Sequence, residues 1–152
     1  MNTSKLLTIF AAGGSLALLL GAFGFQHIGD LAPCKLCLWQ RWPHAAAVLI
    51  GGAVLITGQK VLNWLGALAA AATAGIGLYH TGVERGWWEG PSTCTSSSAG
   101  NMSADDFFNQ VIGAPLIRCD EVAWSLMGLS MASWNAIASL ILMAFWVRAA
   151  TR

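Results

Sequence analysis

The sequence has 152 residues, of which 56% are hydrophobic and only 10% are charged. An ordinary soluble domain carries about 25% charged residues, so this composition excludes one. The net charge is +1 and the lysines and arginines form no cluster, so nothing indicates a nucleic-acid partner. We therefore expect a membrane protein with a single small domain.

Four long apolar runs account for this composition. They cover residues 6–28, 38–57, 61–83 and 122–147, and each has about the 20 residues that a helix needs to cross a bilayer. The first run is longer than the apolar stretch of about 7–15 residues in a signal peptide, so we expect a retained membrane helix. The predicted fold is an all-α bundle of four transmembrane helices with two outward-facing loops, at 29–37 and 84–121.

The second and third runs carry features that constrain their helices. Pro43 has no backbone N–H, so a helix that begins near Cys34 would be kinked there, and a later start is the alternative. In the third run, small residues recur at every fourth position, at Gly66, Ala70 and Ala74. This spacing predicts a helix that packs closely inside the bundle.

The loop at 84–121 contains two of the four cysteines, Cys94 and Cys119. Its first charges, from Glu84 to Glu89, are interpreted as solvated. Apolar residues between 104 and 112 share one side of a short helical pattern. This pattern predicts either an amphipathic helix on the membrane surface or a loop packed on the bundle.

The distribution of charge predicts the orientation in the membrane. Lys5, Lys60, Arg148 and Arg152 lie on one side, and no acidic residue accompanies them. By the positive-inside rule both termini are cytoplasmic and the cysteines face outward, where an oxidising compartment would allow disulfides. Tryptophans near the ends of the runs, including Trp146 at the inner end, are interpreted as the aromatic belt of the two interfaces.

The segment between the first two runs holds the most reactive pattern in the chain. Cys34 and Cys37 have CxxC spacing, and Arg41 follows Cys37 at the i,i+4 distance that places two side chains on one helix face. A cysteine in the first turn of a helix, beside a guanidinium, has a lowered pKa and more thiolate. Redox chemistry is the favoured interpretation, while a structural disulfide and half of a zinc site are the alternatives.

The predicted topology brings both cysteine pairs to one end of the bundle. Two dithiols at one membrane face indicate electron transfer between them by thiolate attack and mixed disulfides. A dithiol delivers two electrons and two protons, and a membrane quinone accepts both. His27 and His80 fall at the same end and His44 slightly inside the second run; His27 and His44 are interpreted as residues without a chemical role.

These motifs together resemble the DsbB family of bacterial disulfide bond formation proteins. CxxC alone is weakly specific, but its combination with the arginine, the four-span layout and the paired loop cysteines is strong. The resemblance covers nearly the whole chain. The matching segments are Phe25-Gln26-His27, Cys34-Lys35-Leu36-Cys37 with Arg41, Tyr79-His80-Thr81, Cys94, Cys119-Asp120-Glu121, Trp124, Gly128-Leu129, Met131 and Trp134.

The resemblance implies a role for each cysteine. Cys94 would be attacked by a reduced periplasmic partner of the thioredoxin fold, similar to DsbA, and Cys119 would complete that shuttle disulfide. Electrons would then pass to Cys34 and Cys37, with Cys119 linked transiently to Cys34. Cys37 would be the thiolate that contacts the quinone.

The resemblance also implies a cofactor and a location. The cofactor would be ubiquinone or menaquinone, held by Arg41 and Cys37 with His80 nearby, and no metal would be needed. Arg41 would stabilise the negative charge that develops on the quinone. The protein would be a multi-pass enzyme of the bacterial inner membrane that supports disulfide formation outside the cytoplasm.

Three alternatives belong to other classes or families. A reductase similar to vitamin K epoxide reductase also pairs a membrane CxxC with loop cysteines, but there the loop cysteines come before the CxxC. A membrane scaffold would use its disulfides only to staple the outer loop. A metal-handling protein would bind its ion at the cysteines and histidines.

Overall fold

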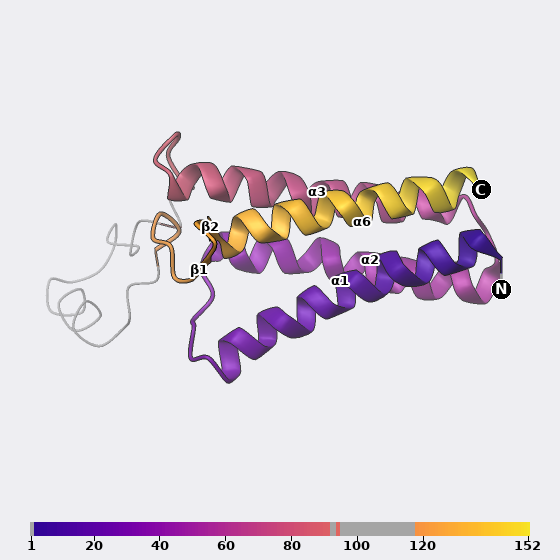
Figure 1. The fold of residues 1–152 in the computed structure, drawn as a ribbon, viewed down its shortest axis with the longest axis horizontal. Helices are drawn as coiled ribbons and strands as arrows, with labels where there is room; N and C mark the ends of the chain where they lie inside the picture. Colours follow the sequence, from indigo (N-terminus) through magenta and orange to yellow (C-terminus); the bar gives the residue numbers. More distant parts are fainter. Residues whose placement is uncertain (1, 92–93, 95–117) are drawn as a thin grey trace, which may run out of the picture.

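The computed structural model describes residues 2–91, residue 94 and residues 118–152. Four long helices make up most of this part of the chain and pack side by side into one elongated bundle (Figure 1). The first and last residues lie at the same end of the bundle, and the connection that carries β1 and β2 lies at the opposite end. The elements are α1 (Thr3–His27), α2 (Lys35–Thr57), α3 (Leu62–Glu84), β1 (Ser125–Leu126), β2 (Leu129–Ser130) and α6 (Met131–Thr151).

The predicted all-α bundle is confirmed. Helices α1, α3 and α6 are each long and apolar enough to cross a membrane. Helix α2 is of similar length but carries Lys35, Gln40, Arg41 and His44 in its first half, which lowers its hydropathy. The predicted short helix at 104–112 lies outside the described residues.

Small residues let the helices approach closely at the centre of the bundle. Gly66, Ala70 and Ala74 are all buried on α3, as their spacing predicts. A Cβ atom at Gly66 would collide with the ring of Trp146 on α6, so only glycine fits there. Trp146 is fully buried in this core, and its interpretation as an interfacial tryptophan is therefore wrong.

Helix α2 begins at Lys35, with Cys34 as its N-cap residue. Pro43 therefore lies inside the helix, which answers the question that the sequence left open. The helix ends at Gly58, where a φ of 72° places the backbone in the left-handed region that glycine adopts at low cost.

The fourth span begins later than its apolar composition indicates. Residues 122–130 are not helical, and Ser125–Leu126 pairs with Leu129–Ser130 as a short antiparallel hairpin. Helix α6 starts at Met131, where the side chain of Ser130 accepts a hydrogen bond from the Ser133 backbone N–H at 3.2 Å. This N-cap hydrogen bond satisfies a backbone donor that a helix start otherwise leaves unpaired, and so sets the boundary.

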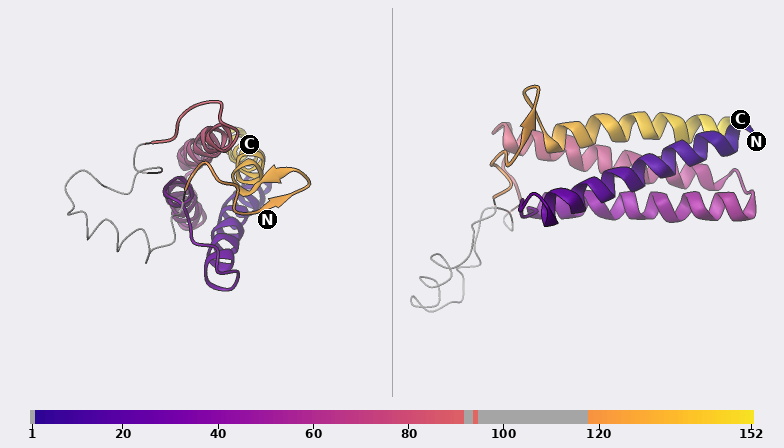
Figure 2. Two further views of the ribbon diagram at one scale, coloured as in Figure 1. Left: turned by 90° about the vertical axis from the view of Figure 1, so that its left-hand side faces the viewer. Right: turned by 60° about the horizontal axis from the view of Figure 1, so that its bottom comes forward.

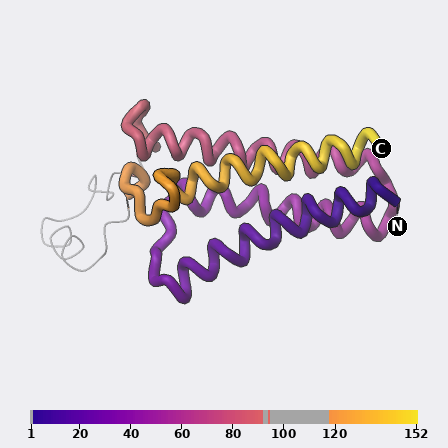
Figure 3. The backbone as a smooth tube through the Cα atoms, in the orientation of Figure 1, coloured from indigo at the N-terminus to yellow at the C-terminus, as the bar shows by residue number. Residues whose placement is uncertain are grey.

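Helix α1 is not parallel to its neighbours. Its first residues lie against the other helices, and its last turns diverge from them toward the end that carries the cysteines (Figures 1 and 3). The left view in Figure 2 shows the same divergence. Residues in the second half of α1, from Ala17 to Phe25, line the cavity described next.

Candidate active site

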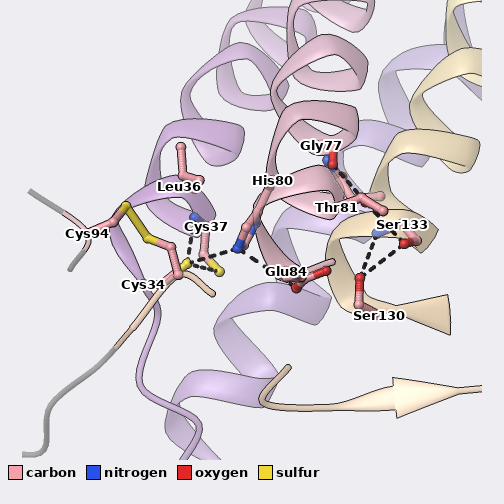
Figure 4. A network of polar contacts seen from close by, with 12 residues as sticks. Cys34, Leu36, Cys37, Gly77, His80, Thr81, Glu84, Cys94, Ser130 and Ser133 are labelled. Atoms are coloured by element: carbon pink, nitrogen blue, oxygen red, sulfur yellow. Dashed lines mark hydrogen bonds and ion pairs between the residues drawn. A yellow bond between two sulfur atoms is a disulfide. The ribbon is translucent and has the colours of Figure 1, made fainter. Parts of the chain in front are cut away.

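The CxxC pair occupies the first turn of α2, ahead of the apolar part of that helix. The Sγ atom of Cys34 caps the helix by accepting the Cys37 backbone N–H at 3.1 Å, and the two sulfurs lie 2.6 Å apart (Figure 4). Both cysteines are free thiols. This separation requires little movement for a disulfide to form or break between them.

The second pair, Cys94 and Cys119, forms a disulfide with a Cα–Cα distance of 5.4 Å. Both residues are buried, and they pack in one cluster with Cys34, Leu36 and Val83. Figure 4 shows this disulfide beside the CxxC turn. The bundle end thus brings all four cysteines together, although about 60 residues separate the two pairs in sequence.

The two CxxC thiols have different acidities. The hydrogen bond from the Cys34 thiol lowers the pKa of Cys37, and this effect exceeds the opposing effect of burial. The same hydrogen bond, with burial, raises the pKa of Cys34. Cys37 is therefore the more acidic thiol of the pair, as the sequence predicts. The main cause is its cysteine neighbour, while the charge of Arg41 contributes less.

His80 and Glu84 reach the CxxC from the end of α3. The Nε2 atom of His80 lies 3.6 Å from the Sγ of Cys34 and 3.8 Å from Oε1 of Glu84. The Glu84 side chain is only 6% exposed, so its interpretation as a solvated loop charge is wrong. It belongs to the helix that carries His80, one turn further on.

The side chain of Gln40 fixes the proton position on His80. Its Nε2 atom contacts the Leu36 carbonyl at 3.2 Å and the Nδ1 of His80 at 3.0 Å. A carbonyl only accepts, so the Gln40 atom between them is the amide nitrogen, which donates to both. In the neutral His80 ring, Nδ1 is then the acceptor and Nε2 carries the proton that faces Cys34.

The polar network continues across the bundle to α6. Asn135 donates from Nδ2 to Oε1 of Gln40 at 2.7 Å and to Oγ1 of Thr73 at 3.1 Å, and its Oδ1 lies 2.9 Å from Nε2 of His44. The sequence analysis did not single out Gln40 or Asn135 and gave His44 no role. Their polarity inside apolar spans was an available signal, because such residues in membrane helices are costly and usually functional.

Arg41 turns toward α1. One terminal guanidinium nitrogen donates to Oε1 of Gln26 at 2.6 Å and the other to the Ala22 carbonyl at 3.2 Å. The guanidinium carbon lies 4.9 Å from the centre of the Phe23 ring, a distance typical of a cation–π contact. These contacts hold the charge between α1 and α2.

A cavity of about 330 Å³ lies at the cysteine end, lined by residues of α1, α2 and α6 and by His80 and Glu84 of α3. Its volume is in the range of sites that bind small organic molecules. Its lining is mostly apolar, and its polar side chains include Cys34, Cys37, Gln40, Arg41, His44 and Asn135. The cavity therefore suits a small apolar molecule with a few hydrogen-bonding atoms.

The sulfurs of Cys34 and Cys37 and the Nε2 of His80 lie within 4.8 Å of one another, a possible set of metal ligands. Tetrahedral zinc with Zn–S bonds of about 2.3 Å keeps its sulfurs about 3.8 Å apart. The sulfurs here are 2.6 Å apart, and the His80 nitrogen that faces them carries a proton. The two sulfurs thus lie closer together than two sulfur ligands of a tetrahedral zinc ion do.

His27 stays apart from these residues. Its side chain is exposed at the end of α1, where its ring stacks on Phe23 with centroids 6.3 Å apart. The predicted site residues Cys34, Cys37 and His80, together with the loop disulfide, thus form one buried group. Arg41 lines the adjoining cavity.

Comparisons with known proteins agree with this arrangement. The sequence model of the family described as Disulfide bond formation protein DsbB matches residues 4–149. The chain belongs to the DsbB family. Membership implies a multi-pass membrane protein with the activity of a thiol-disulfide oxidoreductase. It also decides between this family and the vitamin K epoxide reductase family, as the order of the cysteines indicates.

Individual DsbB relatives align over most of their length. The chain is 31% identical to Disulfide bond formation protein B of Shewanella sp. (strain MR-4), over 89% of this chain and 80% of that protein. It is 28% identical to the protein of the same name from Albidiferax ferrireducens, over 90% of this chain and 81% of the relative. No solved structure matches the chain.

Proposed function

We propose that this protein reoxidises a periplasmic DsbA-like protein of the thioredoxin fold and passes the electrons to a membrane quinone. One observation carries the proposal. Cys34 and Cys37 pack with the Cys94–Cys119 disulfide, and both also line an apolar cavity together with Arg41. The CxxC thus lies between a disulfide that can exchange with it and a place for an apolar acceptor.

The first half of the reaction is thiol exchange. A thiolate of the reduced partner attacks Cys94, the Cys94–Cys119 bond breaks, and Cys119 leaves as a thiolate. The second thiol of the partner then releases Cys94, so that the partner is oxidised and the loop pair is reduced. Attack of Cys119 on Cys34 of an oxidised CxxC, followed by attack of Cys94 on Cys119, restores the loop disulfide and leaves Cys34 and Cys37 reduced.

The second half of the reaction oxidises the CxxC. Cys34 and Cys37 close to a disulfide and release two electrons and two protons, which a quinone held by Cys37 and Arg41 would accept. Cys37 is the reactive thiolate because Cys34 donates a hydrogen bond to it. Arg41, fixed by Gln26 and the Ala22 carbonyl, stabilises negative charge that develops in the cavity.

The structure has a closed loop disulfide beside a reduced CxxC. In the proposed mechanism this state follows electron arrival and precedes quinone reduction. His80 serves the exchange steps as a hydrogen-bond donor to Cys34, because its Nε2 proton faces that sulfur.

The proposed location is the bacterial inner membrane, with both termini in the cytoplasm and all four cysteines in the periplasm. Supporting this, Lys60 Nζ donates to the backbone carbonyl of Arg152 at 2.9 Å, so these two predicted cytoplasmic residues lie at the same end of the bundle. The opposite end holds the cysteines and most acidic residues.

The test is quinone reduction by the purified protein in lipid nanodiscs, with a reduced thioredoxin-fold protein as the electron donor. The expected result is repeated turnover, in which donor thiols are oxidised and quinone is reduced in equal amounts. In Cys37→Ser the reduction of quinone should be abolished. A Cys37→Ser protein that still oxidises one equivalent of donor but reduces no quinone would place the block after thiol exchange. No quinone reduction by the unmodified protein would overturn the proposal.

A further inference from the structure

The side-chain amides between His80 and His44 are held in one orientation by two backbone carbonyls. The Leu36 carbonyl accepts from Gln40, which places the amide nitrogen of Gln40 at that side and its oxygen toward Asn135. Independently, the hydroxyl of Thr73 donates its proton to the backbone carbonyl of Gln40 at 3.2 Å, so the Thr73 oxygen acts as an acceptor toward Asn135. Both contacts require the Asn135 atom that faces Gln40 and Thr73 to be the amide nitrogen.

This orientation determines which nitrogen of His44 carries a proton. With its nitrogen committed to Gln40 and Thr73, Asn135 presents its Oδ1 to Nε2 of His44. An amide oxygen only accepts, so the neutral imidazole must donate from Nε2. Nδ1 of His44 is then a lone pair without a proton.

That lone pair has no partner among the described residues, although His44 is only 4% exposed. A buried acceptor without a hydrogen bond is costly, and His44 lines the apolar cavity. The Nε atom of Arg41 is likewise buried without an acceptor in the part of the chain that the structure describes. Cys37, Arg41 and His44 follow one another at i, i+4 and i+7, which puts them on one face of α2.

Two residues that line the same cavity thus carry one buried unpaired donor and one buried unpaired acceptor, and this pair of atoms matches a particular ligand chemistry. A phenolic hydroxyl accepts one hydrogen bond and donates another, so a hydroquinone satisfies both atoms. A quinone carbonyl only accepts, so it pairs with Arg41 but offers nothing to the bare Nδ1 of His44. The two atoms therefore distinguish the reduced from the oxidised ring.

We propose that His44 is a specificity-determining residue of the cavity: its Nδ1 accepts the hydroxyl proton of a reduced quinone, so that the site binds the hydroquinone more tightly than the quinone. Asn135 is a positioning residue that holds His44 in the required tautomer. This inference rests on the proposed function and adds to it the redox state that the cavity prefers.

The expected size follows from one hydrogen bond. A buried hydrogen bond contributes roughly 1.4 kcal/mol, which corresponds to about tenfold in a dissociation constant. A tenfold preference for the reduced form raises the midpoint potential of a bound two-electron couple by about 30 mV. Reduction of the acceptor at the site is favoured by that amount.

The test measures binding and not turnover. Decylubiquinone and menadione, each oxidised and reduced, are titrated into the protein in nanodiscs with all cysteines replaced by serine, so that no electron transfer occurs. In the His44→Phe variant the hydroquinones should bind about tenfold more weakly, while the quinones change less than about twofold. His27→Phe, an exposed position on α1, is the matched control and should change neither.

The outcomes separate this inference from the proposed function. If the protein binds neither probe in either state, the proposed function fails, and this inference fails with it. If the probes bind and His44→Phe weakens both redox forms equally or neither, the inference is overturned while the proposed function stands. The double variant His44→Phe/Asn135→Leu removes both partners of their hydrogen bond and should reproduce the selective loss.

A spectroscopic measurement does not depend on any variant of His44. Nitrogen NMR of the ring distinguishes a protonated Nε2 from a protonated Nδ1. We expect the Nε2–H form of His44, a change at Nδ1 on addition of reduced but not oxidised probe, and a mixture of tautomers in Asn135→Leu. A protonated Nδ1 in the unmodified neutral ring would contradict the inference.

Discussion

The Nε2 atom of His80 lies 3.6 Å from the Sγ atom of Cys34, and the Gln40 amide on the other side of the ring keeps the proton on that Nε2. His80 therefore faces Cys34 as a hydrogen-bond donor and has no lone pair with which to deprotonate it. In the proposed mechanism, His80 therefore stabilises Cys34 when this residue leaves as a thiolate.

His80→Phe should accordingly slow electron transfer from the loop pair to the CxxC. A hydrogen bond to a charged group contributes about 1.5–3 kcal/mol, so its loss predicts a single-turnover rate roughly 10- to 100-fold lower. His80→Gln keeps an N–H donor, so its single-turnover rate should lie between that of the unmodified protein and that of His80→Phe. Stopped-flow mixing with reduced donor measures the rate, and an unchanged rate in a folded His80→Phe protein would contradict the assignment.

The acidity of Cys37 predicts a specific pH dependence. Only the thiolate reacts with iodoacetamide, and a lowered pKa means that the thiolate persists to lower pH. Alkylation of Cys37, followed by mass spectrometry, should therefore reach half its maximal rate below the pH typical of a thiol. In Cys34→Ala the hydrogen-bond donor to Cys37 is lost, so the midpoint of Cys37 alkylation should move to higher pH. In Cys34→Ser a hydroxyl donor remains, so the midpoint should move less.

Arg41 and Gln26 should affect the quinone step in a graded way. Arg41→Ala should lower kcat/KM for quinone by about 100-fold, as expected for loss of an electrostatic donor, and Arg41→Lys should lower it less because the charge remains. Gln26→Leu leaves Arg41 its contacts with Ala22 and Phe23, so a loss of about tenfold or less is expected.

Thermal unfolding and capture of the thiol partner are the controls for these variants, and both should be unchanged. Near-normal quinone kinetics in a folded Arg41→Ala protein would return Arg41 to the role of an interfacial arginine.

Cys119→Ser leaves Cys94 as a free thiol, which should form a lasting mixed disulfide with a partner that lacks its second cysteine and carries thionitrobenzoate on the first. The Cys94 thiolate attacks the partner sulfur, thionitrobenzoate leaves, and the loop holds no second thiol that could displace the partner. Non-reducing electrophoresis after mixing measures the product. Cys94→Ser is the matched variant and should trap none. A Cys119→Ser protein that turns over normally would contradict the relay.

Reporter fusions test the orientation. Fusions after Lys60 and after Arg152 should report a cytoplasmic position, and a fusion after Gly90 should report a periplasmic one. A periplasmic signal after Lys60 would reverse the topology and place the cysteines in the reducing compartment, where a stable disulfide between Cys94 and Cys119 is not expected.

The sequence predicts those parts of the molecule that depend on local composition. Apolar run length predicts four spans, and the small residues Gly66, Ala70 and Ala74 predict an interior helix. The start of α6 was missed because Val122 to Ser130 is apolar enough to extend a span, whereas Gly128, with a φ of 75°, and the Ser130 cap favour a turn followed by a new helix start.

The polar network could not be derived in the same way. Gln40, Thr73 and Asn135 come from three helices and meet only because α2, α3 and α6 pack together. Glu84 was misread for a related reason, since helical geometry carries it one turn past His80 into the site and not into the loop. Contacts between distant segments depend on packing, which spacing along one chain does not encode.

The divergence of α1 has a consequence for how the acceptor is supplied. The cavity is bordered by Ala17, Gly21 and Phe25 of that helix, on the side where α1 leaves the bundle. If the acceptor is a membrane quinone, as proposed, its long isoprenoid tail would stay among the lipids while its ring enters the cavity sideways from the hydrocarbon phase. Turnover would then depend on the mole fraction of quinone per lipid and not on its bulk concentration, and added inert lipid alone would slow the protein by surface dilution.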